Sequence, residues 1–225
     1  MRGRDERLLT WGIVHRKLLG ILALAVAVLI LGNLAILAAF AVGRAVEPGA
    51  ELAIEGIDNV RRVDDRLFRG EAPTAGGYRA LAERQVATVV DLRAERDLDV
   101  PRALLGELGI DRVSIPIRDG QTPTRAQVEQ FLSVMGRAEG PVFVHCGAGV
   151  GRAGSMAAAY LVAQGEASAR GALARNLAVG PPSLEQIVYV SSLDSDRLPE
   201  QPPKWIETVS RVFDGPRRIW SALRA

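Results

Sequence analysis

The stretch that most constrains the fold is an uncharged apolar run near the start of the chain, residues 18–43 (LLGILALAVAVLILGNLAILAAFAVG). Asn33 is its one strongly polar residue. Because about 20 consecutive apolar residues suffice for a helix to cross a bilayer, the run predicts one transmembrane helix. A signal peptide is the alternative, since Ala39-Phe40-Ala41 fits a small-x-small cleavage pattern, but its apolar region usually has about 7–15 residues. A buried helix of a soluble domain is the third interpretation.

The charges that flank this run predict its orientation. Positive residues tend to stay on the cytoplasmic side of a membrane. We therefore expect a basic cytoplasmic N-terminus at residues 1–17, and an extracytoplasmic location for everything that follows the helix. The charges concerned are Arg2, Arg4, Arg7, Arg16 and Lys17 with Asp5 and Glu6 before the run, then Arg44, Glu47, Glu51, Glu55 and Asp58 after it.

The rest of the chain predicts a linker, one α/β domain and a tail. Residues 44–62 are mostly acidic and irregular, which indicates a linker. In residues 63–200, short valine-rich runs alternate with segments of helical periodicity, which predicts a mostly parallel central sheet of four to five strands flanked by helices. Residues 201–225 have an amphipathic pattern, which favours a helix packed on the domain or a contact with the membrane surface. Strands are expected at 66–70, 86–93, 112–117 and 141–146, and helices at 74–85, 100–110, 124–138, 151–165, 167–179 and 183–193.

Composition excludes several classes of function. The net charge is only +2, and the sequence has no basic stripe with aromatic residues interleaved in it, which argues against a nucleic-acid partner. Cys146 is the single cysteine, so an internal disulfide is excluded. The two histidines, His15 and His145, lie on opposite sides of the apolar run, and no metal site is expected. We expect no cofactor.

The sequence HCGAGVGR, residues 145–152, carries the chemistry. Cys146 ends an expected strand, and a helix is expected to begin at Val150 or Gly151. Small residues between them allow the backbone amides to point to one centre, and such a nest at a helix N-terminus binds anions. Arg152 adds a bidentate grip on two phosphate oxygens. The expected phosphate-binding set is Gly147, Ala148, Gly149, Val150, Gly151 and Arg152.

The same amides and helix N-terminus favour the thiolate form of Cys146. A thiolate at the bottom of an anion site is a nucleophile directed at phosphorus, and the amides and guanidinium would stabilise charge on the phosphoryl oxygens in the transition state. The alternative is a buried structural cysteine beside a tight turn.

HCGAGVGR resembles the active-site loop of the cysteine-dependent protein tyrosine and dual-specificity phosphatases. The segment LFRGEAPT…GYRALAERQVATVVDLR resembles the opening of the bacterial members, and the resemblance covers about residues 60–195. It implies a phosphatase with a phosphocysteine intermediate on Cys146 and a phosphate held by Arg152. It also implies that His145 supports the thiolate from behind, in a chemical or a structural role.

A phosphatase also needs an acid to protonate its leaving group. The family takes this acid from an aspartate on a loop upstream of the cysteine, and Asp119 in IPIRDGQTPT occupies such a loop. A solvated Asp-Gly turn is the alternative reading of Asp119. Asp91 is the other candidate acid, although we expect it to order the sheet edge. By the same resemblance, Gln186 in PPSLEQIVYV would position the water that releases the phosphate.

Ala153 departs from the family pattern, which usually has Ser or Thr directly after the arginine. That hydroxyl donates to the cysteine sulfur, and Ser155 points elsewhere on the expected helix. The phosphatases of regenerating liver, which are slow enzymes, also have GRA here. The sequence therefore favours a membrane-anchored phosphoric monoester hydrolase acting on a phosphorylated protein or on a lipid or small phosphate ester. A slow or inactive phosphate-binding module that acts through a partner is the alternative, and another thiol enzyme is the weakest interpretation.

Overall fold

The computed structural model divides the chain into two compact units, Met1–Ala38 and Ala39–Ala225. Helix α1 (Arg2–Val46) accounts for the first unit, and its stretch His15–Ala45 has a mean hydropathy of 2.8. That stretch is long and apolar enough to cross a membrane, a criterion that a signal sequence also meets. The structure describes the backbone of residues 2–46, 51–95, 102–197 and 199–222, and the side chains of residues 15–45, 51–95, 103–197 and 199–215.

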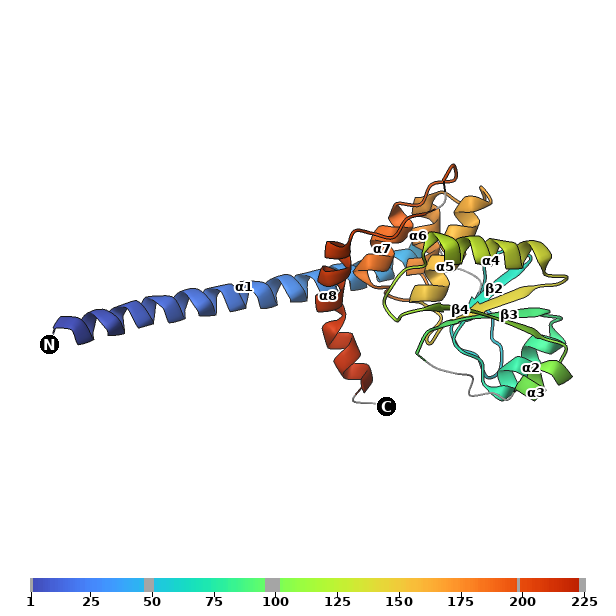
Figure 1. The fold of residues 1–225 in the computed structure, drawn as a ribbon, viewed down its shortest axis with the longest axis horizontal. Helices are drawn as coiled ribbons and strands as arrows, with labels where there is room; N and C mark the ends of the chain where they lie inside the picture. The colour runs from blue at the N-terminus through green and yellow to red at the C-terminus, as the bar shows by residue number, and fades with distance from the viewer. Residues whose placement is uncertain (1, 47–50, 96–101, 198, 223–225) are drawn as a thin grey trace. The chain divides into compact units, whose positions relative to one another are not determined.

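The second unit is built on a five-stranded sheet with the order β1-β2-β5-β3-β4 (Figure 1). β1 pairs antiparallel with β2, and the remaining neighbours pair in parallel. The predicted mostly parallel sheet is therefore confirmed. The strands are β1 (Arg61–Arg62), β2 (Leu67–Gly70), β3 (Thr88–Arg93), β4 (Asp111–Ile117) and β5 (Val142–His145).

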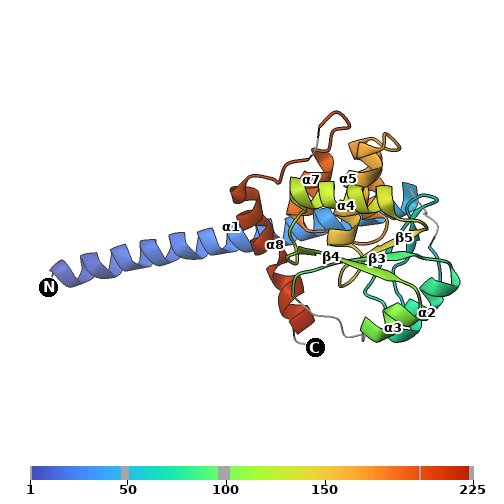
Figure 2. The same cartoon turned by 45° about the vertical axis from the view of Figure 1, so that its right-hand side comes forward.

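Helices cover both faces of this sheet, as Figures 1 and 2 show. Side chains alternate along a strand, so Val89 and Val90 of β3 enter different apolar clusters. Val90 packs with α4 (Arg125–Arg137), α5 (Gly151–Ala163) and α7 (Leu184–Ser191), beside which lies α6 (Ala169–Leu177). Val89 packs with α2 (Ala75–Glu83) and α3 (Arg102–Glu107). Both clusters are apolar, so the sheet forms the middle layer of three.

The prediction of a linker at residues 44–62 is wrong for its second half, residues 51–62. Ile54, Ile57 and Val60 are buried in the cluster on the α2 side, and the short strand β1 extends the sheet. The acidic residues between these apolar side chains concealed their spacing of three. Residues 47–50 lie outside the described residues.

The tail contains helix α8 (Lys204–Ala222), which packs against α7. Ile206 and Ser210 are buried there, and the Ser210 hydroxyl accepts a hydrogen bond at 3.1 Å from the backbone N–H of Glu185. This agrees with the expected helix packed on the domain. The side chains of residues 216–225, the last part of this amphipathic tail, lie outside the described residues.

Candidate active site

Cys146 follows the last residue of β5, and β5 lies between β2 and β3 in the sheet. The carboxyl ends of parallel strands are the usual place for a ligand in an open α/β sheet. Helix α5 begins at Gly151, and its N-cap residue Val150 makes no side-chain capping bond. The first N–H groups of a helix have no partner within the helix, so the start of α5 offers donors to an anion.

Two hydrogen bonds fix the orientation of the loop between Cys146 and Gly151. The backbone N–H of Ala72 donates to the Gly147 carbonyl at 3.2 Å, and the Asn59 side-chain amide donates to the Ala148 carbonyl at 3.1 Å. In a trans peptide the carbonyl and the following N–H point in opposite directions. The N–H groups of Ala148 and Gly149 therefore point away from residues 59 and 72, as an anion nest requires.

The loop needs glycine at two positions. Gly149 has a φ of +72°, and a Cβ there would lie 2.4 Å from the carbonyl carbon of Gly70. At Gly151 an added Cβ would lie 2.5 Å from Oε1 of Gln186. Larger residues would therefore force the loop away from the end of β2 or from α7.

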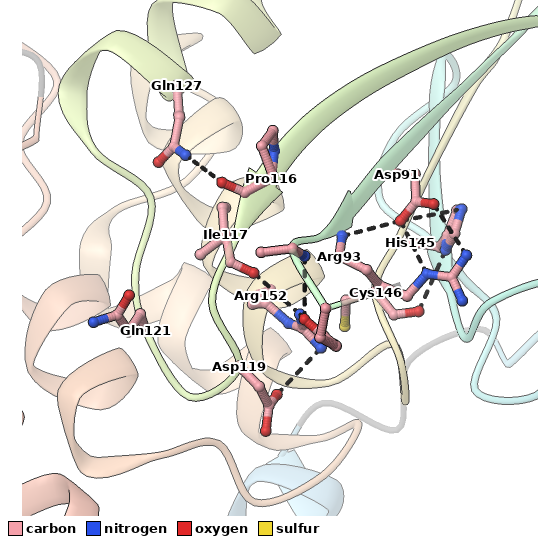
Figure 3. A network of polar contacts seen from close by, with 12 residues as sticks. Asp91, Arg93, Pro116, Ile117, Asp119, Gln121, Gln127, His145, Cys146 and Arg152 are labelled. Carbon is pink, nitrogen blue, oxygen red and sulfur yellow. Dashed lines mark hydrogen bonds and ion pairs between the residues drawn. The ribbon is translucent and has the colours of Figure 1, made fainter. Parts of the chain in front are cut away.

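Arg152 is buried, and three groups hold its guanidinium (Figure 3). Nη1 donates to Oε2 of Glu95 at 2.7 Å and to the Ile117 carbonyl at 3.1 Å, while Nη2 lies 3.2 Å from Oδ1 of Asp119. In Figure 3 the Cys146 sulfur lies beside this guanidinium. The orientation of Arg152 is thus set from the ends of β3 and β4.

One cavity of about 240 Å³ joins the predicted site residues. Cys146, Arg152, Asp119 and Gln186 line it together with the loop residues Ala148, Val150 and Gly151. Gly147 and Gly149 lie in the same loop, but they do not line the cavity. The structure therefore brings the nucleophile, cation and acid expected from the sequence to one place.

Gln186 is buried in the wall of this cavity, and its amide is engaged on both sides. Oε1 accepts from the backbone N–H of Ser183 at 2.9 Å, and Nε2 donates to the Gln121 carbonyl at 3.0 Å. The first bond belongs to a capping box that begins α7. These contacts give Gln186 a structural task, whatever its part in positioning water.

His145 lies behind the loop and outside the cavity lining. Its ring is fully buried and stacks on Phe143, with Nδ1 at 3.3 Å from the Cys146 carbonyl and Nε2 at 3.9 Å from Asp91. Burial lowers the pKa of His145 to about 4, although the Asp91 carboxylate opposes this. The ring is therefore neutral at pH 7, and it supports the backbone at Cys146 rather than supplying a positive charge.

Asp91 belongs to this rear network and not to the cavity. Burial alone would raise the pKa of Asp91, but hydrogen bonds from Arg93 outweigh it and hold the pKa at about 2. Arg93 and Arg112 both pair with its Oδ2, at 3.0 and 3.2 Å. In Figure 3 this group lies apart from Asp119, and it ties β3 to β4. This agrees with the structural role expected for Asp91.

The lowered pKa of His145 predicts acid destabilisation. An unfolded histidine has a pKa of about 6.5. Between pH 6.5 and 4, His145 is therefore protonated in the unfolded chain but stays neutral in the folded chain. The contribution of His145 to the free energy of unfolding is therefore complete above pH 6.5, and it falls by about 1.4 kcal/mol per pH unit as the pH drops through this window. Asp91, with a pKa near 2, titrates below the window. Urea unfolding of the full chain in detergent micelles at pH 7, 6 and 5 measures this slope, which His145→Gln should reduce. An equal slope in both proteins would contradict the prediction.

Three residues near the site were not expected from the sequence. Glu95 follows β3, and an acidic residue after the strand beside β5 was the available signal. Asp214 of α8 lines the cavity, but nothing in a distant amphipathic tail indicates this. Asn59 has a φ of +54°, a left-handed conformation that asparagine tolerates better than most residues. Its contact with Ala148 spans 89 positions, so no local pattern predicts it.

Comparison with known proteins identifies the family. The model of the family described as "DSP-PTPase phosphatase fused to NAD+ Kinase" matches residues 41–192, about two thirds of the chain. The chain belongs to this family of dual-specificity and tyrosine phosphatases. The resemblance of HCGAGVGR to the active-site loop of cysteine-dependent phosphatases is thereby confirmed at the level of the family.

Individual relatives agree with this assignment. The mouse dual specificity protein phosphatase CDC14A is 36% identical over 52% of this chain and 19% of its own length. The Caenorhabditis elegans tyrosine-protein phosphatase cdc-14 is 33% identical over 51% of this chain and 16% of its own length. The crystal structure of P. aeruginosa TpbA has a TM-score of 0.56 and 29% identity, over 67% of this chain and 93% of that one. The chain thus spans about a fifth or less of the length of the two curated relatives, CDC14A and cdc-14.

Proposed function

We propose that this family member hydrolyses phosphoric monoesters through a phosphocysteine intermediate. The single observation that carries the proposal is the cavity shared by Cys146, Arg152 and Asp119. A thiol, backbone donors, a guanidinium and a carboxyl in one cavity are the set of groups that phosphoryl transfer to sulfur needs.

In the first step the Cys146 thiolate attacks phosphorus, and a sulfur–phosphorus bond forms as the bond to the leaving oxygen breaks. The loop amides and Arg152 stabilise the charge on the phosphoryl oxygens. Asp119, in its protonated form, gives its proton to the leaving oxygen. Water then attacks phosphorus and loses a proton to Asp119, the sulfur–phosphorus bond breaks, and inorganic phosphate leaves. Gln186 lines the same cavity and would contact this water.

The experiment is a panel of substrates given to the full chain in detergent micelles. It contains phosphotyrosine and phosphoserine peptides, phosphoinositides, phosphatidylglycerophosphate and nucleotides. The structure of TpbA in complex with phosphotyrosine favours the first of these. Hydrolysis of any ester that Cys146→Ser abolishes supports the proposal and names the substrate class. Hydrolysis by Cys146→Ser at the wild-type rate would reject it.

A slow or inactive phosphate-binding module is the second candidate, and Ala153 favours it. Ala153 is fully buried in the same cluster as Cys146, and it has no hydroxyl to donate to the leaving thiolate. Ser155 is buried too, so neither residue faces solvent. Phosphate binding by the intact protein without turnover of any member of the panel would favour the module.

Ala153→Ser is expected to raise kcat by about tenfold. A hydrogen bond to a charged group contributes about 1.5–3 kcal/mol, and each 1.4 kcal/mol removed from a barrier is tenfold in rate. The added donor acts on the leaving thiolate, so the gain should appear in breakdown of the intermediate and not in its formation. Rapid-quench kinetics separate the two steps, and Ala157→Ser, on the same buried helix one turn further, is the matched control. A kcat that is unchanged or lower in a folded Ala153→Ser protein would contradict this.

We further propose that residues 18–43 anchor the protein as a single-pass cell membrane protein, with residues 1–17 cytoplasmic and the catalytic domain of residues 63–200 extracytoplasmic. The apolar length of α1 and the basic residues before it support this. C-terminal fusions to one reporter active outside the cytoplasm and one active inside it test the orientation. Activity of the cytoplasmic reporter alone would overturn it.

A further inference from the structure

A second cavity of about 260 Å³ lies on the α5 side of the sheet, near the edge formed by β1 and β2. None of residues 145–152 lines it. Four arginines do: Arg61, Arg62, Arg69 and Arg175. Among the described residues, no carboxylate side chain lines it. The family's catalytic loop therefore does not account for this concentration of positive charge.

Arg69 is the central feature of the cavity. It comes from β2 and is 4% exposed, and its Nη1 donates to Oδ1 of Asn176 at 3.0 Å. Its Nε and Nη2 have no hydrogen-bond partner among the described residues, and the same is true of Nδ2 of Asn176, which is 1% exposed. Nε and Nη2 carry the parallel N–H bonds of one guanidinium edge, the edge that grips a carboxylate or phosphate in a bidentate manner.

Buried donors without acceptors are costly, and a buried charge without a counter-charge is more so. Burial lowers the pKa of Arg69 to about 10, so the side chain keeps its charge at neutral pH. Native proteins satisfy nearly all such groups, so three unpartnered donors in one cavity call for an acceptor.

The pairing of Arg69 with Asn176 depends on a specific residue of α5. A Cβ at Gly154 would lie 1.8 Å from Oδ1 of Asn176 and 2.7 Å from Nη1 of Arg69. Glycine in a helix interior is less favourable than alanine. The close approach that this glycine permits therefore indicates a built pocket, and not a chance gap between side chains.

The remaining arginines add to this charge to different degrees. Arg61 pairs with Glu51 at 3.1 Å and Arg62 pairs with Asp65, so part of their charge is already offset. Arg175, in the last turn of α6, is an exposed residue at the cavity. Arg69 and Arg175 are thus the cations best suited to hold an incoming anion.

We propose that this cavity is a second anion site that binds a phosphate group, apart from the catalytic cavity at Cys146. Nε and Nη2 of Arg69 donate to two phosphate oxygens, Nδ2 of Asn176 donates to another, and Arg175 adds charge. The phosphate is that of the free ion or that of an anionic lipid headgroup. The proposal stands without the proposed hydrolysis, since neither Cys146 nor Asp119 contacts the bound phosphate, although Arg69 does interact electrostatically with Cys146.

Equilibrium dialysis of radiolabelled inorganic phosphate against the full chain in detergent micelles tests this. Two equivalents per chain are expected for the wild type. Arg152→Met should remove the catalytic class and leave one equivalent, and Arg69→Met should remove the other. Arg175→Gln should weaken the second class by about tenfold, the worth of one charge-assisted contact, whereas Arg170→Gln, on the exposed side of the same helix, should not.

One equivalent in the wild type that disappears in Arg152→Met would overturn the proposal, and so would two equivalents in Arg69→Met. Arg69→Met removes a buried charge but also leaves Oδ1 of Asn176 without its donor, so the folding of this variant is checked by its thermal midpoint measured without phosphate. If Arg69→Met does not fold, Arg175→Gln against Arg170→Gln decides, and equal affinities in the two would overturn the proposal. Arg152→Met, which lacks the catalytic class, distinguishes the sources in micelles that contain phosphatidic acid: displacement of its bound phosphate identifies a lipid headgroup, and no displacement identifies the free ion.

Discussion

Arg152→Lys is expected to lower kcat/KM for a phosphate monoester by about 10³-fold. Lysine keeps the positive charge, but it cannot present two parallel donors to two phosphoryl oxygens. Glu95 and the Ile117 carbonyl fix one nitrogen of the guanidinium, so the other edge is oriented before substrate enters. Fixed donors directed at developing charge provide effects of about 10²–10³-fold each, and arginines in phosphoryl transfer provide more.

The control for this variant is Arg137→Lys, at an exposed position in the last turn of α4. It should stay within about twofold of the wild type, as an exposed arginine remote from the site should. The kcat and KM of both variants should be measured on the same ester. If Arg152→Lys retains more than about a third of the wild-type kcat/KM, bidentate binding by Arg152 does not explain the site.

Asp119→Asn is expected to lower kcat by about 10²–10³-fold for an ester with a basic leaving group, since a positioned general acid contributes about 10²–10⁴-fold. Asparagine can keep a hydrogen bond to Arg152, but it has no proton to give. For an ester whose leaving phenol is acidic enough to depart unprotonated, the loss should be below about tenfold. Measuring kcat across phenols of graded acidity tests this.

The dependence on the leaving group separates two roles for Asp119. Its carboxylate pairs with Nη2 of Arg152 at 3.2 Å, so it also positions the guanidinium. A purely positioning role would give the same loss with every leaving group, and that outcome would contradict general acid catalysis. Asp111→Asn is the matched control, because Asp111 lies at the exposed start of β4, the strand that precedes Asp119. This variant should leave kcat unchanged for all of the leaving groups.

Most of the fold was predictable from local sequence patterns. The valine runs of β3 and β5 are buried on both faces of the sheet, and such strands read as continuous apolar stretches. Thr124 begins α4 through a capping box with Gln127, a signal confined to four residues. Residues 51–62 were missed because β1 has two residues and owes its place to pairing with β2, which no local pattern reveals.

The candidate site divides in the same way. Cys146, Arg152 and the glycines between them form one continuous motif, so the sequence alone reveals them. Asp119 lies on a loop directly after a strand and upstream of Cys146, and this position in the chain made it predictable as well. Glu95, Asn59 and Asp214 reach the loop or its cavity from three distant segments, and only the folded chain brings them there. The Arg69 cavity is likewise formed from β1, β2, α5 and α6, and an arginine in LFRG gives no sign of its burial.

Trapping of the phosphoenzyme tests the central claim most directly. The full chain should be mixed with a phosphate monoester that it hydrolyses and quenched in acid during turnover, and its peptides should then be analysed by mass spectrometry. We predict phosphate on the sulfur of Cys146, less of it in Ala153→Ser because breakdown is faster there, and none in Cys146→Ser. Steady hydrolysis with no phosphate on Cys146 in either the wild type or Ala153→Ser, and continued hydrolysis by Cys146→Ser, would contradict a phosphocysteine intermediate.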